Sequence, residues 1–514
     1  MYPGAYARAD QPAVIMAGSG EVITYAMLEA RSNRLAHLLR AQGLKRLGHI
    51  SIFMENTPQY LACCLAAERT GLYYTCINSF LTADEAAYIL ENSESRLLIT
   101  SQAKREVALA AMAQCPAVSL CLVVDGPGDG GRVRNLDEAC AAYPATPVGD
   151  EALGTAMLYS SGTTGRPKGV LRPLPDQPPG EPLPMFAGIA QLWGFRRGMT
   201  YLSPAPLYHA APHLGVNLTL RQGGTVVVME RFDPEVFLRL VEQYRVTHTQ
   251  LVPTMFSRML KLQAEVRGRH DLSSLEIAIH AAAPCPPLVK EAMIQWWGPI
   301  IYEYYGMTEG MGFTACTTPE WLAHRGTVGR VLMGELRILD PDMNEVPPGE
   351  IGTVWFKLAY DFEYYNDKPR TAAVLSDDGS MGTAGDVGYV DADGYLYLTD
   401  RASFMIISGG VNIYPQECED LLISHPWVQD AAVFGVPNVD LGEEVKAVVQ
   451  LVGGVAEGPE VAAELIAHCG RHLARQKVPR SIDFEAELPR LPTGKLYKRV
   501  LRERYWAGHA TQIV

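Results

Sequence analysis

Segments with helical spacing alternate with short β-rich runs along most of the chain. Residues 26–43 (AMLEARSNRLAHLLRAQG) place four leucines on one side of a helix that a glycine ends. Residues 224–230 and 275–284 are apolar runs typical of buried strands, and the second of them runs into a loop. Residues 394–401 alternate like a half-exposed strand. Such alternation is typical of layered α/β proteins. We therefore expect an α/β fold of sheets and helices.

The length of 514 residues allows more than one domain. Residues 403–422 (SFMIISGGVNIYPQECEDLL) give an apolar run, a Gly-Gly turn and a helix opened by Pro415 in its first turn. Two strand-like runs and a further helical segment follow, which together have the size of a small α+β domain. We predict a large N-terminal domain, residues 1–402, and a small C-terminal cap domain, residues 403–514.

Composition excludes several classes of function. The 44 basic and 57 acidic residues give a net charge of -13 without a basic run, so nucleic acid is not an expected partner. The N-terminus lacks a basic segment followed by an apolar core, and no apolar run is long enough to span a bilayer. Neither C-x-x-C nor H-E-x-x-H occurs, which argues against a bound transition metal. We expect a cytoplasmic protein with no transmembrane segment.

Residues 159–170 (YSSGTTGRPKGV) combine hydroxyls, glycines and a lysine, as expected of a loop that holds an anion. Pro167 before the lysine breaks the Walker pattern, and the Rossmann G-x-G-x-x-G is also missing. Taken alone, the stretch fits a polar surface loop equally well. The residues that can contact a phosphate are Ser160, Ser161, Gly162, Thr163, Thr164, Gly165 and Lys168.

Three further stretches carry groups suited to a nucleotide. In residues 301–310 (IYEYYGMTEG), Glu309 can ligate Mg2+ and Tyr305 can lie flat on a base. In residues 385–401 (GDVGYVDADGYLYLTDR), Asp386 suits ribose hydroxyls and Arg401 suits phosphate or ribose oxygens, at the two ends of a predicted hairpin. Residues 491–499 (LPTGKLYKR) hold Lys495 in a turn. Each also has a simpler interpretation: buried tyrosines, a surface hairpin and a solvated basic tail.

In this order and at these separations, the four stretches resemble the signature of the AMP-forming acyl-CoA synthetases, members of the adenylate-forming superfamily. The resemblance extends over roughly residues 23–506. It implies a reaction in two steps. A carboxylate attacks the α-phosphate of ATP to give an acyl-adenylate and pyrophosphate, and the thiol of coenzyme A then attacks the activated carbonyl and releases AMP. It also implies ATP, Mg2+ and coenzyme A as cofactors and co-substrates.

The resemblance further implies a role for each matching residue. The loop 160–168 would hold the β- and γ-phosphates, Thr308 the α-phosphate and Glu309 the Mg2+. The adenine would lie between Tyr305 and the turn Ala282-Ala283-Pro284, with Asp386 and Arg401 on the ribose. Lys495 would stabilise the adenylation transition state. Rotation of the cap about a hinge at Ser403 would then bring Gly409 and Gly410 into the site for thioester formation.

Four positions depart from the family pattern. Ser403 stands where many relatives have Asp or Lys at the hinge, and Ala384 where a threonine often precedes the Gly-Asp pair. Ala281 and Ala282 replace the usual glycines near the adenine, which we expect to tighten the nucleotide pocket slightly. None of these changes removes a charged catalytic group.

Residues 204–213 (PAPLYHAAPH) resemble the family segment that gates the acyl pocket, with His209 at the gate and Tyr208 before it. A histidine satisfied within a buried turn is the alternative for His209. Amino-acid-activating relatives commonly have an aspartate in this segment, and this chain has no acidic residue there. The remaining residues expected near the acyl group are apolar or amphipathic: Tyr304, Met307 and Met311. We therefore expect a hydrophobic acid of the fatty, aryl or steroid side-chain class.

A carboxylate–CoA ligase is thus the leading hypothesis, and the local sequence most resembles bacterial fatty-acid and steroid or bile-acid CoA ligases. Within the same fold, an adenylation enzyme that loads a carrier protein in trans is the second, and a luciferase-like oxygenase the third. A nucleotide-binding regulator without catalysis is the alternative from another class. The retained charged residues argue against a regulator, because simple binding does not need a lysine on a mobile cap. A homodimer is left open.

Overall fold

The structure is a computed structural model that describes residues 8–160, 166–181, 183–358, 362–401, 404–490 and 496–507. The chain forms two compact units. Unit 1 comprises residues 1–250, 270–277 and 362–371, and unit 2 comprises residues 251–269, 278–361 and 372–514.

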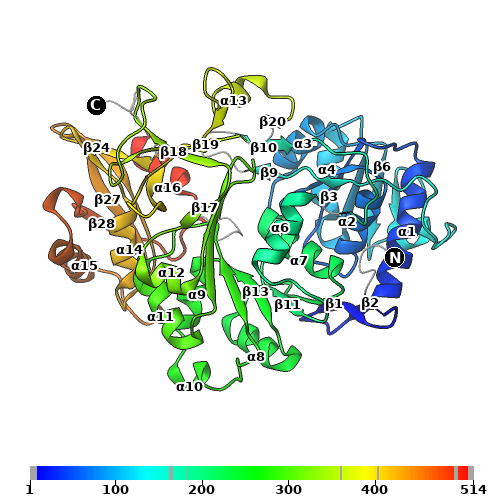
Figure 1. Cartoon of the computed structure of the whole chain (residues 1–514), viewed down its shortest axis with the longest axis horizontal. Coiled ribbons are helices and arrows are strands. Elements are labelled where there is room, and N and C mark those ends of the chain that lie inside the picture. Colours follow the sequence, from blue (N-terminus) through cyan, green and yellow to red (C-terminus); the bar gives the residue numbers. More distant parts are fainter. Residues whose placement is uncertain are drawn as a thin grey trace. The chain divides into compact units, whose positions relative to one another are not determined.

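A six-stranded parallel sheet forms one half of unit 1 (Figure 1). Its strands in spatial order are β7 (Val133–Asn135), β6 (Leu120–Val124), β5 (Leu97–Ser101), β3 (His49–Phe53), β4 (Tyr73–Cys76) and β8 (Thr155–Ala156). The helices are α1 (Tyr25–Ala41), α2 (Tyr60–Arg69), α3 (Ala83–Asn92), α4 (Arg105–Gln114) and α5 (Leu136–Cys140). Strands β3, β5 and β6 are buried at every residue, as expected of a parallel sheet covered on both faces.

The other strands of unit 1 form a second parallel run and a small hairpin sheet. In the parallel run, β11 (Thr200–Ser203) lies between β13 (His248–Leu251) and β12 (Thr225–Val228), and β1 (Pro12–Met16) follows β12. Strand β2 (Val22–Thr24) pairs with β1 in antiparallel orientation. Strand β10 (Lys168–Leu171) pairs with β9 (Tyr159–Ser160) and β20 (Glu363–Tyr364). The helices are α6 (Pro184–Leu192), α7 (Ala210–Arg221), α8 (Pro234–Tyr244) and α13 (Lys368–Ala372).

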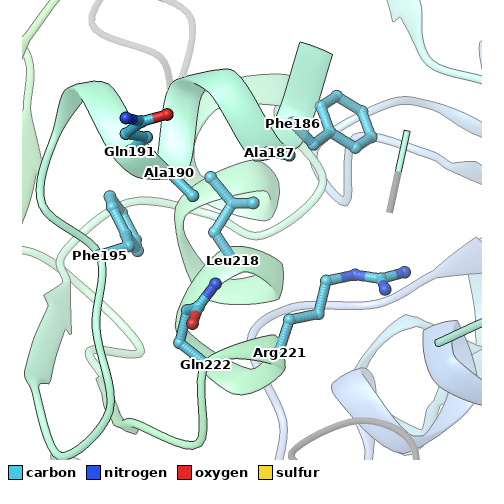
Figure 2. A pocket seen from close by; sticks show the side chains of 8 residues that line it. All are labelled: Phe186, Ala187, Ala190, Gln191, Phe195, Leu218, Arg221 and Gln222. Carbon is cyan, nitrogen blue, oxygen red and sulfur yellow. The ribbon is translucent and has the colours of Figure 1, made fainter. Parts of the chain in front are cut away.

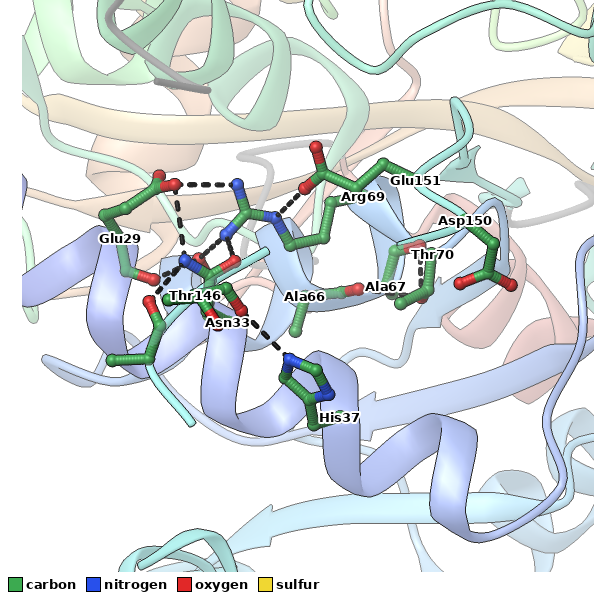
Figure 3. A network of polar contacts seen from close by, with 12 residues as sticks. Glu29, Asn33, His37, Ala66, Ala67, Arg69, Thr70, Thr146, Asp150 and Glu151 are labelled. Carbon is green, nitrogen blue, oxygen red and sulfur yellow. Dashed lines mark hydrogen bonds and ion pairs between the residues drawn. The ribbon is translucent and has the colours of Figure 1, made fainter. Parts of the chain in front are cut away.

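A buried arginine joins separate parts of unit 1 (Figure 3). Arg69, at the end of α2, is 1 % exposed and forms ion pairs with Glu29 of α1 at 3.0 Å and with Glu151 at 2.9 Å. It also donates to Ser32 and Asn33. The guanidinium therefore links two helices to the segment that leads into β8 and β9.

Unit 2 contains a largely antiparallel sheet. Its spatial order is β18 (Glu335–Leu339), β19 (Gly352–Lys357), β22 (Asp386–Val390), β23 (Tyr395–Arg401), β17 (Gly329–Met333), β16 (Phe313–Cys316), β15 (Ile301–Gly306) and β14 (Ile277–His280), with β21 (Met381–Gly382) on β19. Only the β14 and β15 pair is parallel among the printed pairings of these strands. The helices are α9 (Pro253–Leu260), α10 (Ala264–Arg267), α11 (Pro287–Trp297) and α12 (Thr318–Ala323).

The C-terminal part of unit 2 has its own sheet and core. The strands are β25 (Val411–Ile413), β24 (Ile406–Ser408), β27 (Gly442–Leu451) and β26 (Val428–Asn438), with β28 (Ser481–Phe484) on β27. Helices α14 (Gln416–Ser424) and α15 (Pro459–His472) pack on one face, and α16 (Lys498–Trp506) packs on the other. Val433 and Phe434 of β26 belong to opposite cores, as the alternation of a strand requires.

Most predicted elements are confirmed, with shifted ends. The helix predicted over residues 26–43 is α1, which Thr24 caps by accepting from the Met27 N–H. Residues 275–284 were predicted to be a strand that runs into a loop, and β14 ends at His280 with a loop after it, which confirms that prediction. Pro415 is the N-cap of α14 and not its first turn. Among the described residues, no helix has the length and apolar character needed to cross a membrane.

Candidate functional site

Three residues expected to bind the nucleoside meet in unit 2. Asp386 starts β22 and lies opposite Arg401 at the end of β23, as the hairpin prediction requires. The Arg401 guanidinium forms an ion pair with Asp386, with Nε 3.0 Å from Oδ1, and the Tyr305 hydroxyl donates to Asp386 Oδ2 at 2.7 Å. Asp386 is 7 % exposed. Each carboxylate oxygen therefore has a polar partner, which holds the Asp386 side chain in one orientation.

Tyr305 is a neutral donor in this cluster. Burial raises the pKa of its phenol well above 10, and the adjacent Asp386 carboxylate raises that pKa further. Its ring lies 6.3 Å from the ring of Phe356, measured between centroids. The hydroxyl and the ring thus have different partners, and the tyrosine orientation is fixed at both.

The turn expected to face the adenine follows β14 directly. Its residues Ala282, Ala283 and Pro284 join β14 to α11. Ala282 has a φ of 75°, in the left-handed region that glycine occupies more easily than alanine. The alanine that replaces a family glycine is therefore strained.

Thr308 and Glu309 lie in a turn that begins where β15 ends. The Gly310 N–H donates to the Met307 carbonyl at 2.9 Å and closes this turn. Glu309 is 8 % exposed. Its carboxylate is the kind of hard oxygen ligand that Mg2+ prefers.

The residues of the expected phosphate loop lie in unit 1, where the structure describes the two strands that flank the loop. Lys168 of β10 pairs with Ser160 of β9, so these two residues form the base of a hairpin. The Lys168 ammonium lies 4.5 Å from the centroid of the Tyr364 ring, a cation–π contact. Some expected site residues fall outside the described residues: Ser161, Gly162, Thr163, Thr164, Gly165, Ser403 and Lys495.

His209 and Tyr208 lie at the start of α7, also in unit 1. His209 is the N-cap residue of this helix, and its ring meets the Tyr208 ring edge-on at a centroid distance of 4.4 Å. Burial lowers the pKa of His209 to about 3, so the imidazole is neutral at pH 7. Its Nε2 is buried and has no hydrogen-bond partner among the described residues. The site thus offers a neutral polar atom and no positive charge at this point.

A pocket lies beside the other end of α7 (Figure 2). It has a volume of about 310 Å³, within the range typical of small-molecule sites. Helix α6 contributes Phe186, Ala187 and Ala190, and α7 contributes Leu218. Arg221 lies at its edge, and its guanidinium is held by Glu68 and by Asn217 at 2.7 Å. The lining is therefore mostly apolar.

The remaining acyl-pocket candidates lie around β15 in unit 2. The Tyr304 ring stacks on Phe313 at 5.2 Å between centroids. Met307 is half-buried and Met311 is buried. Tyr304 and Tyr305 are successive residues of one strand and point to opposite faces of the sheet.

Gly409 and Gly410 form the turn between β24 and β25. Their φ angles are 57° and 79°, the left-handed pair that a tight hairpin turn requires. The Gly409 N–H donates to the Leu441 carbonyl at 2.8 Å. The glycines are therefore needed by the local backbone, whatever else they do.

A buried polar cluster next to the turn of residues 282–284 was not predicted from the sequence. It consists of His280, Lys290 and Glu303. Lys290 lies in an amphipathic helix, where a lysine is usually solvent-exposed. Its burial follows from the packing of α11 on the sheet, which no local pattern reveals.

Comparison with known proteins agrees with this arrangement. The chain matches the family AMP-binding enzyme over residues 4–365 and the AMP-binding enzyme C-terminal domain over residues 417–495. It is 32 % identical to the long-chain-fatty-acid–CoA ligase FadD13 of Mycobacterium tuberculosis, over 94 % of this chain and 93 % of that protein. It is 33 % identical to a feruloyl-CoA synthase of Amycolatopsis, over 98 % of both chains.

A solved structure extends the comparison to the fold. ATP-bound MatB of Rhodopseudomonas palustris superposes with a TM-score of 0.81 at 29 % identity, over 97 % of this chain and 96 % of that one. The chain therefore belongs to the AMP-binding enzymes and, within the adenylate-forming superfamily, to the acyl-CoA synthetases, AMP-forming ligases that use ATP to activate an acid and coenzyme A to form the thioester.

Proposed function

We propose that this enzyme converts a hydrophobic carboxylic acid to its acyl-adenylate and then to its CoA thioester. The observation that supports the nucleotide half of this proposal most directly is the Asp386 carboxylate, held by Tyr305 and Arg401. Ribose hydroxyls are donors, so a carboxylate that is held in one orientation is a suitable acceptor for them.

Other residues contact the remaining parts of the nucleotide in this proposal. The Tyr305 ring and the turn Ala282-Ala283-Pro284 hold the adenine, and Thr308 contacts the α-phosphate. Glu309 holds Mg2+, which supplies positive charge against the phosphates. The loop 160–168 holds the β- and γ-phosphates, and Lys168 at the base of its hairpin contributes a cation.

The C-terminal residues separate the two half-reactions. Lys495 stabilises the negative charge that develops when the carboxylate attacks the α-phosphate. The turn of Gly409 and Gly410 serves the thioester step. The corresponding domain boundary stays at residues 402 and 403, with residues 1–402 as the ATP- and acyl-binding domain, residues 403–514 as the cap and Ser403 as the hinge. The cytoplasmic location and the homodimer remain predictions.

The acid is hydrophobic because the candidate acyl residues offer no charge to pair with a second polar group. His209 is neutral, Tyr208 and Met311 are buried, and Tyr304 is half-buried. His209 lies at the N-terminal end of α7, and the pocket between α6 and α7 lies near its C-terminal end, where it can bind an apolar tail. Fatty, aryl-propenoic and steroid side-chain acids all satisfy these features. The two ligases described above are named for a long-chain fatty acid and for a feruloyl group, which belong to the first two of these classes.

Replacement of Asp386 tests the nucleotide assignment. Asp386→Asn keeps the size of the side chain but removes its charge and one acceptor, so we expect the KM for ATP to rise about 10- to 100-fold, as for loss of a charged hydrogen bond. The matched control is Asp391→Asn at the opposite end of the same hairpin, where the carboxylate binds His324. An unchanged KM for ATP in Asp386→Asn, or an equal rise in the control, contradicts the assignment.

A further inference from the structure

A buried ion pair lies beside the end of β14 and the middle of β15. The Lys290 Nζ donates to Glu303 Oε2 at 2.5 Å, and the two side chains are 0 % and 7 % exposed. Transfer of two charges from water to such a site costs about as much as their attraction returns, and two apolar side chains often replace such a pair without loss of stability. Stability alone therefore gives no reason for the pair.

The pair has two further neighbours that hold its geometry. The Lys290 ammonium lies 4.8 Å from the centroid of the buried Trp321 ring. His280 Nε2 lies 3.4 Å from Glu303 Oε2. Burial lowers the pKa of His280 well below 6.5, and the Lys290 charge lowers it further, so the histidine is neutral at pH 7. The cluster thus contains one cation and one anion, each with a fixed partner.

The position of the cluster connects it to the adenine subsite. His280 is the last residue of β14 and pairs in register with Glu303 of β15. Residues 281–286 leave from His280 and enter α11, which carries Lys290 on its first turns. Glu303 lies two residues before Tyr305, on the same face of β15. The contacts among His280, Lys290 and Glu303 therefore join both ends of the turn 281–286 to the strand that carries Tyr305.

The strained backbone at Ala282 needs neighbouring elements that hold it in place. Ala282 has a φ of 75°, and a residue in this region keeps its conformation only where the surrounding structure holds it there. The elements on both sides of Ala282 are tied by Lys290, Glu303 and His280. A free turn would relax and lose the shape that faces the base.

We propose that Lys290 and Glu303 are positioning residues for the adenine subsite. Their ion pair sets the distance between α11 and β15, and thereby the shape of the turn 281–286 and the direction of Tyr305. Neither side chain contacts the nucleotide in this proposal. It rests on the proposed function, because it requires that the turn and Tyr305 bind adenine.

The test uses the full chain and compares Lys290→Met with the double variant Lys290→Met/Glu303→Met. The single variant leaves a buried unpaired carboxylate, so its melting temperature falls. The double variant replaces the pair by apolar side chains and keeps a melting temperature near that of the wild type. We expect both variants to bind ATP about 10- to 100-fold more weakly by isothermal titration calorimetry, as for a displaced positioning group.

Two further readouts separate positioning from stability. The ratio of the dissociation constants of GTP and ATP falls in the double variant, because a loosened turn discriminates bases less well. Arg69→Met is the control: it removes a cation of similar burial from the α1 and α2 network, lowers the melting temperature and leaves ATP binding unchanged. If the double variant does not fold, Glu303→Gln, which preserves the shape of the side chain, is measured in its place with the same expectation.

Wild-type affinity and base preference in a folded double variant, or in Glu303→Gln, would overturn the inference. These readouts need no acid substrate. A wild-type chain that binds ATP but forms no acyl-adenylate with any acid would contradict the proposed function, while the ATP dissociation constants would still test the positioning role.

Discussion

Ala282 holds a backbone conformation that costs alanine more than glycine. Its φ of 75° brings the Cβ atom close to the following carbonyl oxygen. We expect Ala282→Gly to raise the free energy of unfolding by about 1 kcal/mol, measured by urea denaturation with tryptophan fluorescence. Ala283→Gly is the control, because its φ is not positive and the added freedom of the unfolded chain should destabilise it. Shifts in the same direction for both variants would contradict the strain at Ala282.

The burial of His248 makes the free energy of unfolding depend on pH. Burial lowers its pKa from 6.5 to about 4. Between these values the unfolded chain binds a proton that the folded chain excludes, so stability is present above pH 6.5 and is lost as the pH falls towards 4. This one residue accounts for about 2 kcal/mol of loss between pH 7 and pH 5.

The variant His248→Gln removes that contribution. Its free energy of unfolding should fall by about 2 kcal/mol less between pH 7 and pH 5 than that of the wild type, whatever its absolute stability. Urea denaturation at both pH values measures the difference. Parallel losses in the two proteins would show that His248 does not titrate as its burial requires.

At the scale of elements, local sequence patterns predicted the helices, hairpins and turns that depend on neighbouring residues. The alternation of residues 394–401 and the acidic turn before them were enough to place Asp386 opposite Arg401, which the register confirms. The leucines of α1 and the Gly409-Gly410 turn are likewise local signals. The nucleotide residues came from the family resemblance and not from periodicity.

Contacts between distant segments could not be predicted in this way. Strand β20 pairs with β10 nearly two hundred residues away and brings Tyr364 under Lys168. Lys290 reaches Glu303 only because α11 packs back on the sheet. The local sequence gives no signal for either pairing. The residues that support the expected site could therefore not be predicted, whereas candidate ligand-binding residues could be named.

The pocket between α6 and α7 gives a prediction for the acid. Ala187→Trp places a large side chain against its lining, so kcat/KM should fall for long acids and change little for short ones, because only a long tail reaches this end of α7. Leu192→Trp, on the exposed end of α6 and outside the lining, is the control. A series of saturated acids of increasing length measures the effect. An equal loss for all lengths would place the tail elsewhere.

At the scale of the whole molecule, the proposed function assigns the two half-reactions to different C-terminal residues. Lys495→Ala should slow adenylation about 10²- to 10³-fold and spare thioester formation from a supplied acyl-adenylate. Gly409→Leu should do the reverse, since its φ of 57° disfavours a side chain and a Cβ atom there would lie 3.2 Å from Leu441 Cδ2. Pyrophosphate release and acyl-CoA formation report the two steps separately. Equal loss of both steps in either variant would refute its assignment.

The most direct test of the whole account measures pyrophosphate release with ATP, Mg2+ and coenzyme A across fatty, aryl and steroid carboxylic acids, with the acyl-CoA followed by mass. The account predicts stoichiometric pyrophosphate and acyl-CoA for at least one class of hydrophobic acid and neither product for amino acids. Pyrophosphate without acyl-CoA would assign the acyl group to a carrier protein instead. Failure of every hydrophobic acid to release pyrophosphate, from a chain that binds ATP, would contradict the account.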